Sequence, residues 1–142
     1  MKSDINFDCV IPNSLWIGSR PSCLEDIHYL QEELGVTDII DLCEEYPQVQ
    51  CPSDVTLHRF PVVEHTPPTL QQLKSILRII ESGTSNGVVY VHCRYGLGRA
   101  PTVILSYLMS IGVPLKKGFQ FLKDKRPQIC PSKSQMRFLR EL

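Results

Sequence analysis

Residues 88–102, with the sequence VVYVHCRYGLGRAPT, decide the fold of this chain. The stretch starts with apolar, mostly β-branched residues, which are typical of a short buried strand. Two glycines then allow a tight loop, and the apolar residues of 103–111 predict a helix. Cys93 therefore stands at the end of a strand, and Arg99 stands where the next helix begins.

This strand, loop and helix have the composition of an anion-binding site. The loop can turn its backbone N–H groups inward around a tetrahedral oxyanion, and the first turn of the helix adds partial positive charge. The guanidinium of Arg99 can hold two oxygens of the same anion. The same positive field would stabilise Cys93 as a thiolate, which is the nucleophilic form of cysteine.

The rest of the sequence alternates between strand-like and helix-like segments. Patterns of apolar residues predict strands at 15–18, 36–43, 55–60 and 88–91. They predict helices at 24–34 with a Ser22 cap, at 70–80 with a Thr69 cap and a break at 83–87, and at 103–111, 115–125 and 132–142, with loops at 44–54 and 61–68. We predict an α/β fold with a central, mostly parallel sheet of four to five strands flanked by helices. Such folds bind ligands at the carboxyl ends of their strands, where Cys93 lies.

Composition limits the class of protein. At 142 residues with 42% hydrophobic content, we expect residues 1–142 to form a single domain. Equal numbers of basic and acidic residues, 15 each, exclude a generally basic nucleic-acid binder, so we expect no nucleic-acid partner. No signal peptide, membrane span or lipid anchor is evident, which favours a cytoplasmic chain, with a nuclear one as a variant. We expect a monomer.

The six cysteines form no CxxC pair and no metal-type spacing with the four histidines. We therefore expect no metal site and no cofactor. Without a secretion signal, a disulfide framework is not expected either, and most of the thiols are interpreted as structural.

The residues HCxxGxxR at 92–99 resemble the signature of cysteine-dependent protein tyrosine phosphatases, in particular their dual-specificity branch. The resemblance extends over most of the chain: LWIG at 15–18, GVTDIIDLCEE at 35–45, FPVVEHTPPTL at 60–70 and GRAPTVILSYLMSIG at 98–112. It implies a protein tyrosine phosphatase-like fold and hydrolysis of phosphate esters without a metal.

The resemblance also implies roles for the residues of this loop. Cys93 attacks phosphorus and forms a phosphocysteine, while Arg99 stabilises the oxygens of the transition state. His92 orients the loop and favours the thiolate. The substrate-binding residues are those of the loop itself: Arg94, Tyr95, Gly96, Leu97 and Gly98.

The resemblance also implies that the general acid lies in the loop of residues 61–68. Relatives place an Asp there, about thirty residues before the Cys, and the matching residue is Glu64. Glu can protonate a leaving oxygen as Asp does, provided that the loop accommodates its longer side chain. Asp41, Asp54 and His65 remain alternatives.

Two further positions bear on the reaction. Many relatives have a hydroxyl residue after the Arg, where this chain has Ala100, and we expect slow breakdown of the phosphoenzyme. Cys43, in DLCEE, resembles the position of a cysteine that traps the oxidised nucleophile as a disulfide, with a buried structural thiol as the alternative.

The sequence leaves several substrate classes open. Phosphotyrosine and phosphoserine or phosphothreonine in proteins are expected first. Arg94 beside the nucleophile resembles phosphoinositide-cleaving members, and Ala100 with Glu64 motivates a catalytically weak phosphate-binding module. A sulfurtransferase or arsenate reductase also uses a Cys-led anion loop, but the His before Cys93 and the proline-rich acid loop favour a phosphatase.

Overall fold

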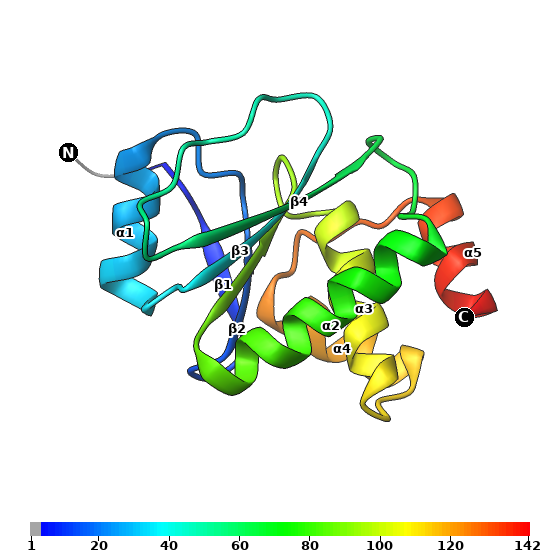
Figure 1. Ribbon diagram of the computed structural model, residues 1–142. Helices are drawn as coiled ribbons and strands as arrows, with labels where there is room; N and C mark the ends of the chain where they lie inside the picture. Colours follow the sequence, from blue (N-terminus) through cyan, green and yellow to red (C-terminus); the bar gives the residue numbers. More distant parts are fainter. Residues whose placement is uncertain (1–3) are drawn as a thin grey trace.

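The computed structural model describes residues 4–142, which contain five strands and five helices (Figure 1). In chain order these are β1 (Phe7–Ile11), β2 (Leu15–Gly18), α1 (Leu24–Leu34), β3 (Asp38–Cys43), β4 (Thr56–Val62), α2 (Leu70–Asn86), β5 (Val89–His92), α3 (Arg99–Ser110), α4 (Leu115–Lys125) and α5 (Lys133–Glu141).

The strands form one sheet in the order β1-β2-β5-β3-β4. The β2–β5, β5–β3 and β3–β4 pairs are parallel, so the predicted α/β fold with a mostly parallel sheet is confirmed. The antiparallel strand β1 was not predicted, because its five residues FDCVI carry a polar Asp8 and pair only at the edge of the sheet. The strand β5, which precedes Cys93, lies at the centre.

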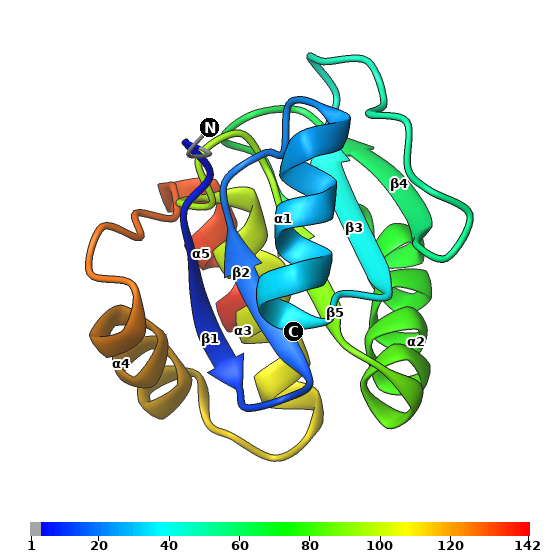
Figure 2. The same ribbon diagram turned by 90° about the vertical axis from the view of Figure 1, so that its left-hand side faces the viewer.

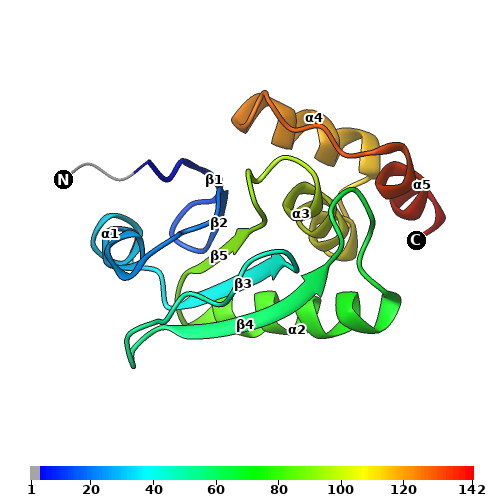
Figure 3. The same cartoon turned by 90° about the horizontal axis from the view of Figure 1, so that it is seen from above.

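Helices cover both faces of the sheet. Figures 2 and 3 show α1 on one face and α2, α3, α4 and α5 on the other. Successive side chains of β5 point to opposite faces of the sheet. Val89 and Val91 pack in the core beneath α3, while Tyr90 packs in the core beneath α1. All three are fully buried, so β5 is held rigidly from both faces.

Helix α3 is buried over most of its length, from Arg99 to Leu108, because α2, α4 and α5 surround it. An apolar run with little polar patterning is the sequence of such a helix. Its rigid placement fixes the position of Arg99 at its first turn.

Several details of these elements differ from the prediction. Helix α2 continues through Gly83 to Asn86, since this glycine is buried where a Cβ would meet the Val89 side chain at 2.5 Å. Strand β4 extends through Pro61 to Val62, which an edge strand permits. Helix α1 has the predicted bounds but not the predicted cap: Cys23 precedes its first residue, and the backbone N–H and hydroxyl of Ser22 bond to Asp26.

Within residues 4–142, every helix is too short or too polar to span a lipid bilayer.

Candidate functional site

The sheet register places the end of β5 between two neighbouring strands. His92 lies opposite Gly18 of β2 and opposite Asp41 of β3. Cys93 follows directly and is 3% exposed. The nucleophile candidate therefore leaves the centre of the sheet at the carboxyl end of its strands, where the sequence placed it.

The loop of residues 94–98 directs its carbonyl groups outward. All five carbonyls accept hydrogen bonds. The N–H groups of Arg20, Cys130 and Thr102 donate to the carbonyls of Arg94 (3.0 Å), Leu97 (2.7 Å) and Gly98 (3.1 Å), respectively. The guanidinium of Arg126 donates through Nη2 to the carbonyl of Tyr95 (2.8 Å) and through Nε to that of Gly96 (3.0 Å). By contrast, the N–H groups of residues 94–98 have no acceptor within the described part of the chain. A row of unpaired N–H groups beside a helix N-terminus is an anion site.

Two residues make this loop geometry possible. Gly96 has φ 72°, and a Cβ there would collide with the carbonyl of Gly18. Arg126 is 3% exposed, donates to two loop carbonyls and pairs with Asp8 at 2.8 Å. Sequence reasoning missed Arg126, since an Arg before Pro127 at the end of a helix gives no sign of a buried loop partner.

Arg99 is 2% exposed and is oriented by Glu45, a residue that sequence reasoning also missed. Its Nη1 and Nη2 donate to the two carboxylate oxygens of Glu45 at 2.8 and 2.7 Å, and Nη1 also donates to the carbonyl of Val62 at 2.8 Å. Hydrogen bonding to Arg99 lowers the pKa of Glu45 to about 2. Burial works against the charge of Arg99, but the hydrogen bond with Glu45 and the negative charges around the guanidinium together outweigh it, so the pKa of Arg99 is raised.

The other edge of the Arg99 guanidinium stays open. Neither Nε–H nor the second Nη2–H donates to an acceptor within residues 4–142, and these two groups lie on one edge of the planar fork. Arg99 lines the same pocket as Cys93. The sequence-based expectation of a bidentate anion contact therefore needs the Nε and Nη2 edge, because the Nη1 and Nη2 edge is occupied by Glu45.

His92 is buried and bonds to the backbone of its neighbour. Its Nδ1 lies 3.1 Å from the carbonyl oxygen of Cys93, which can only accept, so Nδ1 carries the proton. Burial lowers the pKa of His92, although the carboxylate of Asp41, 3.7 Å from Nε2, opposes this. A neutral His92 therefore fixes the backbone of Cys93.

A pocket of about 320 Å³ opens above Cys93. Its lining brings together the predicted residues Glu64, Cys93, Arg94, Tyr95, Leu97, Gly98 and Arg99 with His65 and Cys130. Glu64 reaches to 3.8 Å from Nη2 of Arg99, and its other carboxylate oxygen lies 3.2 Å from His65. Glu64 thus lies in the same pocket as Cys93 and Arg99, and its role as the acid stays a prediction.

The loop that carries Glu64 is held by the start of α5. The hydroxyls of Ser132 and Ser134 donate to the carbonyl of His65 at 2.7 and 2.9 Å, and Nε2 of Gln135 donates to the carbonyl of Thr66 at 3.1 Å. Gln135 is fully buried, and its Oε1 lies so close to Gly98 that a Cβ added there would be 3.3 Å from it. It was missed, because a Gln in a first helical turn is interpreted as a cap.

Two of the three remaining acid alternatives lie outside the pocket. Asp54 lines a separate pocket beside Gly35, and Asp41 is 4% exposed beneath His92. His65 does line the pocket, with a side chain that is 79% exposed. Gly96, also predicted to bind substrate, is buried within the loop and does not line the pocket, and its φ of 72° shapes the loop backbone.

Cys43 is buried at the end of β3, with Asp41 and His92 beside it. Burial, followed by the charge of Asp41, raises the pKa of its thiol. One possible ligand atom from each of these three residues lies within 4.8 Å of the others, a grouping that linear spacing did not suggest. Cys130, interpreted from the sequence as structural, is instead exposed and lines the pocket of Cys93.

Comparison with known proteins agrees with this architecture. The family model described as "Swiss Army Knife protein, DSP-PTPase phosphatase domain" matches residues 4–142. Human dual specificity protein phosphatase 16 is 29% identical over 128 residues, which cover 87% of this chain and 18% of that protein. Laforin from mouse is 27% identical over 150 residues, covering 88% of this chain and 45% of its own.

Solved structures agree as well. The crystal structure of human DUSP28 superposes with a TM-score of 0.80 at 28% identity, covering 92% of this chain and 91% of that one. The chain spans less than half the length of the two curated relatives above. With nearly all of its residues matched by the family model, the chain belongs to the dual-specificity phosphatase-type family of cysteine-dependent protein tyrosine phosphatases.

Proposed function

We propose that this chain hydrolyses phosphate monoesters through a phosphocysteine on Cys93, and that its substrates are phosphotyrosine and phosphoserine or phosphothreonine in proteins. The observation that carries the proposal is the polarity of the loop. Every carbonyl of residues 94–98 is bonded outward, which leaves the N–H groups and the open edge of Arg99 around Cys93.

The first step forms a bond between Sγ of Cys93 and phosphorus and breaks the bond from phosphorus to the ester oxygen. The loop N–H groups and Arg99 stabilise the negative charge that spreads over the other oxygens. The protonated carboxyl of Glu64 gives its proton to the leaving oxygen. Its place in the pocket, near Arg99, supports this assignment.

In the second step water attacks phosphorus, the carboxylate of Glu64 takes a proton from the water, and the sulfur–phosphorus bond breaks. The residue after Arg99 is the buried Ala100, which has no hydroxyl to assist the departing sulfur. Thr102 does not replace it, because its hydroxyl donates to the carbonyl of Gly98 at 2.8 Å. We therefore expect the second step to limit turnover.

The test is hydrolysis of a generic aryl phosphate and of an alkyl phosphate by the wild type, Cys93→Ser and Glu64→Gln. Cys93→Ser should abolish turnover of both. Glu64→Gln should slow the alkyl ester more than the aryl ester, because a good leaving group needs less protonation. Turnover that survives in Cys93→Ser would exclude the cysteine mechanism, and an equal loss on both esters would exclude Glu64 as the acid.

A phosphate-binding module is the second candidate, and Ala100 favours it. A module of this kind would bind a phosphorylated partner through the same loop with negligible turnover. Phosphopeptide affinity of Cys93→Ser, measured beside the turnover of the wild type, separates the two functions. A phosphoinositide substrate is a further candidate, favoured by the exposed Arg94 on the rim of the pocket.

The cellular setting is part of the proposal. All six cysteines are unpaired, which supports a reducing cytoplasmic or nuclear location. We further propose that the chain acts as a monomer and that residues 1–142 form one catalytic domain.

A further inference from the structure

Two arginines share one aromatic ring beside the pocket of Cys93, and one of them, Arg94, lines that pocket. The guanidinium carbon of Arg20 lies 4.3 Å from the centre of the Tyr46 ring, and that of Arg94 lies 5.8 Å from the same centre. Arg94 also lies 4.8 Å from the centre of the Tyr95 ring. Cations at these distances are attracted to the face of the ring, so Tyr46 holds two positive charges close together.

Neither of these charges is neutralised by a carboxylate of residues 4–142. Within residues 4–142, neither guanidinium has a carboxylate within 4.0 Å, whereas the buried Arg99 and Arg126 each have one. Arg20 makes one long side-chain hydrogen bond, to the carbonyl of Pro47 at 3.4 Å, and Arg94 makes none among the described residues. Like charges held together without a counterion form a site for an anion.

The backbone around this pair is fixed on both sides. The N–H of Arg20 donates to the carbonyl of Arg94 at 3.0 Å, which ties the β2–α1 loop to the loop of Cys93. Arg59 donates to the carbonyl of Tyr46 at 2.7 Å and to that of Cys43 at 3.0 Å, which fixes the loop that carries the ring. The two cationic side chains are therefore placed by rigid backbone.

We propose that Arg20, Tyr46 and Arg94 form a second anion subsite, and that the substrate is a compact molecule with a second phosphate close to the one that reacts. The proposal rests on the proposed hydrolysis of phosphate monoesters, and within that function it favours the compact phosphoinositide-type substrate over a phosphoprotein. Arg94 follows Cys93 in the chain and lines its pocket, so the two phosphates must be close neighbours on one scaffold. Two phosphates on neighbouring carbons of a cyclic polyol meet this requirement better than two separate residues of a peptide.

The test compares an inositol bisphosphate that carries vicinal phosphates with an inositol monophosphate at constant ionic strength. Arg20→Ala should lower the ratio of kcat/KM for the bisphosphate to that for the monophosphate about tenfold, the loss of one charge-assisted contact. Tyr46→Phe should keep the ratio because it keeps the ring, and Tyr46→Leu should lower it. An unchanged ratio in Arg20→Ala overturns the subsite.

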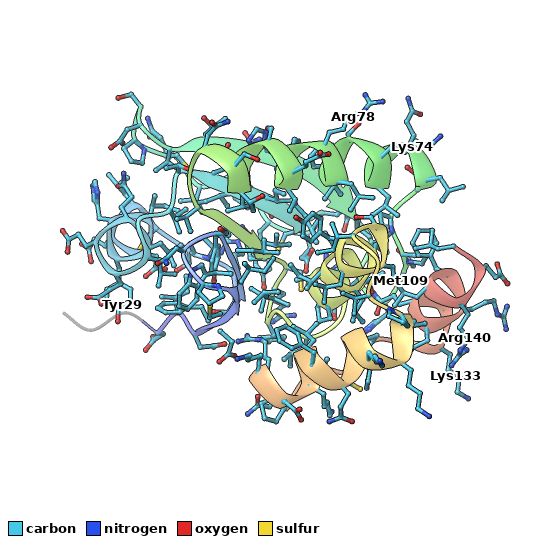
Figure 4. The ribbon with its side chains drawn as sticks, turned by 90° about the horizontal axis from the view of Figure 1, so that it is seen from below. Tyr29, Lys74, Arg78, Met109, Lys133 and Arg140 are labelled. Atoms are coloured by element: carbon cyan, nitrogen blue, oxygen red, sulfur yellow. The ribbon has the colours of Figure 1, made fainter. Side chains whose placement is uncertain are left out.

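A control variant removes the same charge elsewhere. Arg78 is exposed on α2, and Figure 4 shows its side chain pointing away from the molecule. Arg78→Ala should leave the ratio unchanged, and a ratio that falls as far as in Arg20→Ala would point to net charge rather than to a subsite. A doubly phosphorylated peptide completes the set: a loss confined to the peptide overturns the assignment to a compact polyol.

Binding to Cys93→Ser separates this proposal from the proposed function. In this variant, titration calorimetry should still detect tighter binding of the bisphosphate than of the monophosphate, and Arg20→Ala should remove the difference. Such a result in a protein without turnover would support the subsite even if hydrolysis failed. Equal affinity for both ligands in Cys93→Ser would overturn it.

Discussion

The carboxylate of Glu45 holds the guanidinium of Arg99 with both of its oxygens, at 2.8 and 2.7 Å. With the carbonyl of Val62 as a third acceptor, this contact sets the plane of Arg99 before any ligand arrives. The Nε and Nη2 edge, which has no hydrogen-bond acceptor within residues 4–142, then remains available to a ligand. Donors that are oriented in advance need no reorganisation as charge develops in the transition state, which is why this contact matters for catalysis.

Glu45→Gln should therefore reduce activity without touching the substrate. The amide keeps one acceptor but turns an N–H₂ toward the guanidinium, so that Arg99 loses its orientation. We expect kcat/KM for an aryl phosphate to fall about tenfold or more, the effect of one charged hydrogen bond. Steady-state kinetics measures this. Glu44→Gln, a matched change at the exposed neighbour, should leave kcat/KM near the wild-type value, and equal losses would refute the role of Glu45.

The same pair predicts how stability depends on pH. The pKa of Glu45 falls from its ordinary 4.5 to about 2 in the folded chain, mainly through its hydrogen bond to Arg99. A carboxyl whose pKa is lower when folded stabilises fully above its unfolded pKa and loses this stabilisation as the pH falls through its folded pKa. Denaturant unfolding should thus show a decline between pH 4.5 and 2 that is smaller in Glu45→Gln. Identical declines in the two proteins would contradict the assignment.

Gly96→Ala should damage the anion loop more than an equally strained substitution elsewhere. Gly96 and Gly112 both have left-handed backbone, with φ 72° and 98°. An Ala costs about 1 kcal/mol of strain at either position. A Cβ at Gly96 also collides with the carbonyl of Gly18, whereas one at Gly112 meets open space. Phosphate inhibition of Gly96→Ala should weaken sharply and that of Gly112→Ala should not. Equal inhibition constants would show that the loop tolerates the shift.

Much of this fold could be predicted because its signals are local. The stretch from Val88 to Thr102 carries a strand, a loop and a helix in a single run, and periodicity suffices for each. Strand β1 was not predicted, since its pairing with β2 at an edge depends on a neighbour and hardly on its own pattern. Gly83 was taken as a helix break, but packing against Val89 outweighs its low helix propensity.

The residues of the site also differ in whether a local sequence signal identifies them. Cys93, Arg99 and Glu64 stand in recognisable motifs, whereas Glu45, Arg126 and Gln135 contact Arg99, the anion loop and the Glu64 loop from 30 to 69 residues away in the sequence. One available signal was overlooked for Glu45. It follows the carboxyl end of a strand expected beside the nucleophile strand, and such ends meet at one edge of a parallel sheet.

Ala100→Ser should accelerate the second half of the reaction alone. A hydroxyl after Arg99 can donate to the departing sulfur of Cys93, which lowers the barrier to hydrolysis of the phosphocysteine. With an aryl phosphate in rapid mixing, the wild type should release a burst of phenol and then turn over slowly. The serine variant should show the same burst rate and a faster slow phase. A slow phase that does not change would mean that the missing hydroxyl is not limiting.

Oxidation by peroxide should join Cys93 to Cys43. Peroxide converts the thiolate of Cys93 to a sulfenic acid, and a second thiol then attacks this sulfur, forms the disulfide and releases water.

Two thiols are candidates: Cys43, buried beside the nucleophile strand, and Cys130, exposed in the pocket. The pairing of Asp41 with His92 places the ends of β3 and β5 side by side and favours Cys43, although burial raises the pKa of its thiol and should make the reaction slow. Peptide mapping should find a Cys43–Cys93 bond in the wild type and in Cys130→Ser, and sulfinic acid at Cys93 in Cys43→Ser. A Cys93–Cys130 bond would move the role to the pocket thiol, and sulfinic acid in the wild type would leave the chain without either trap.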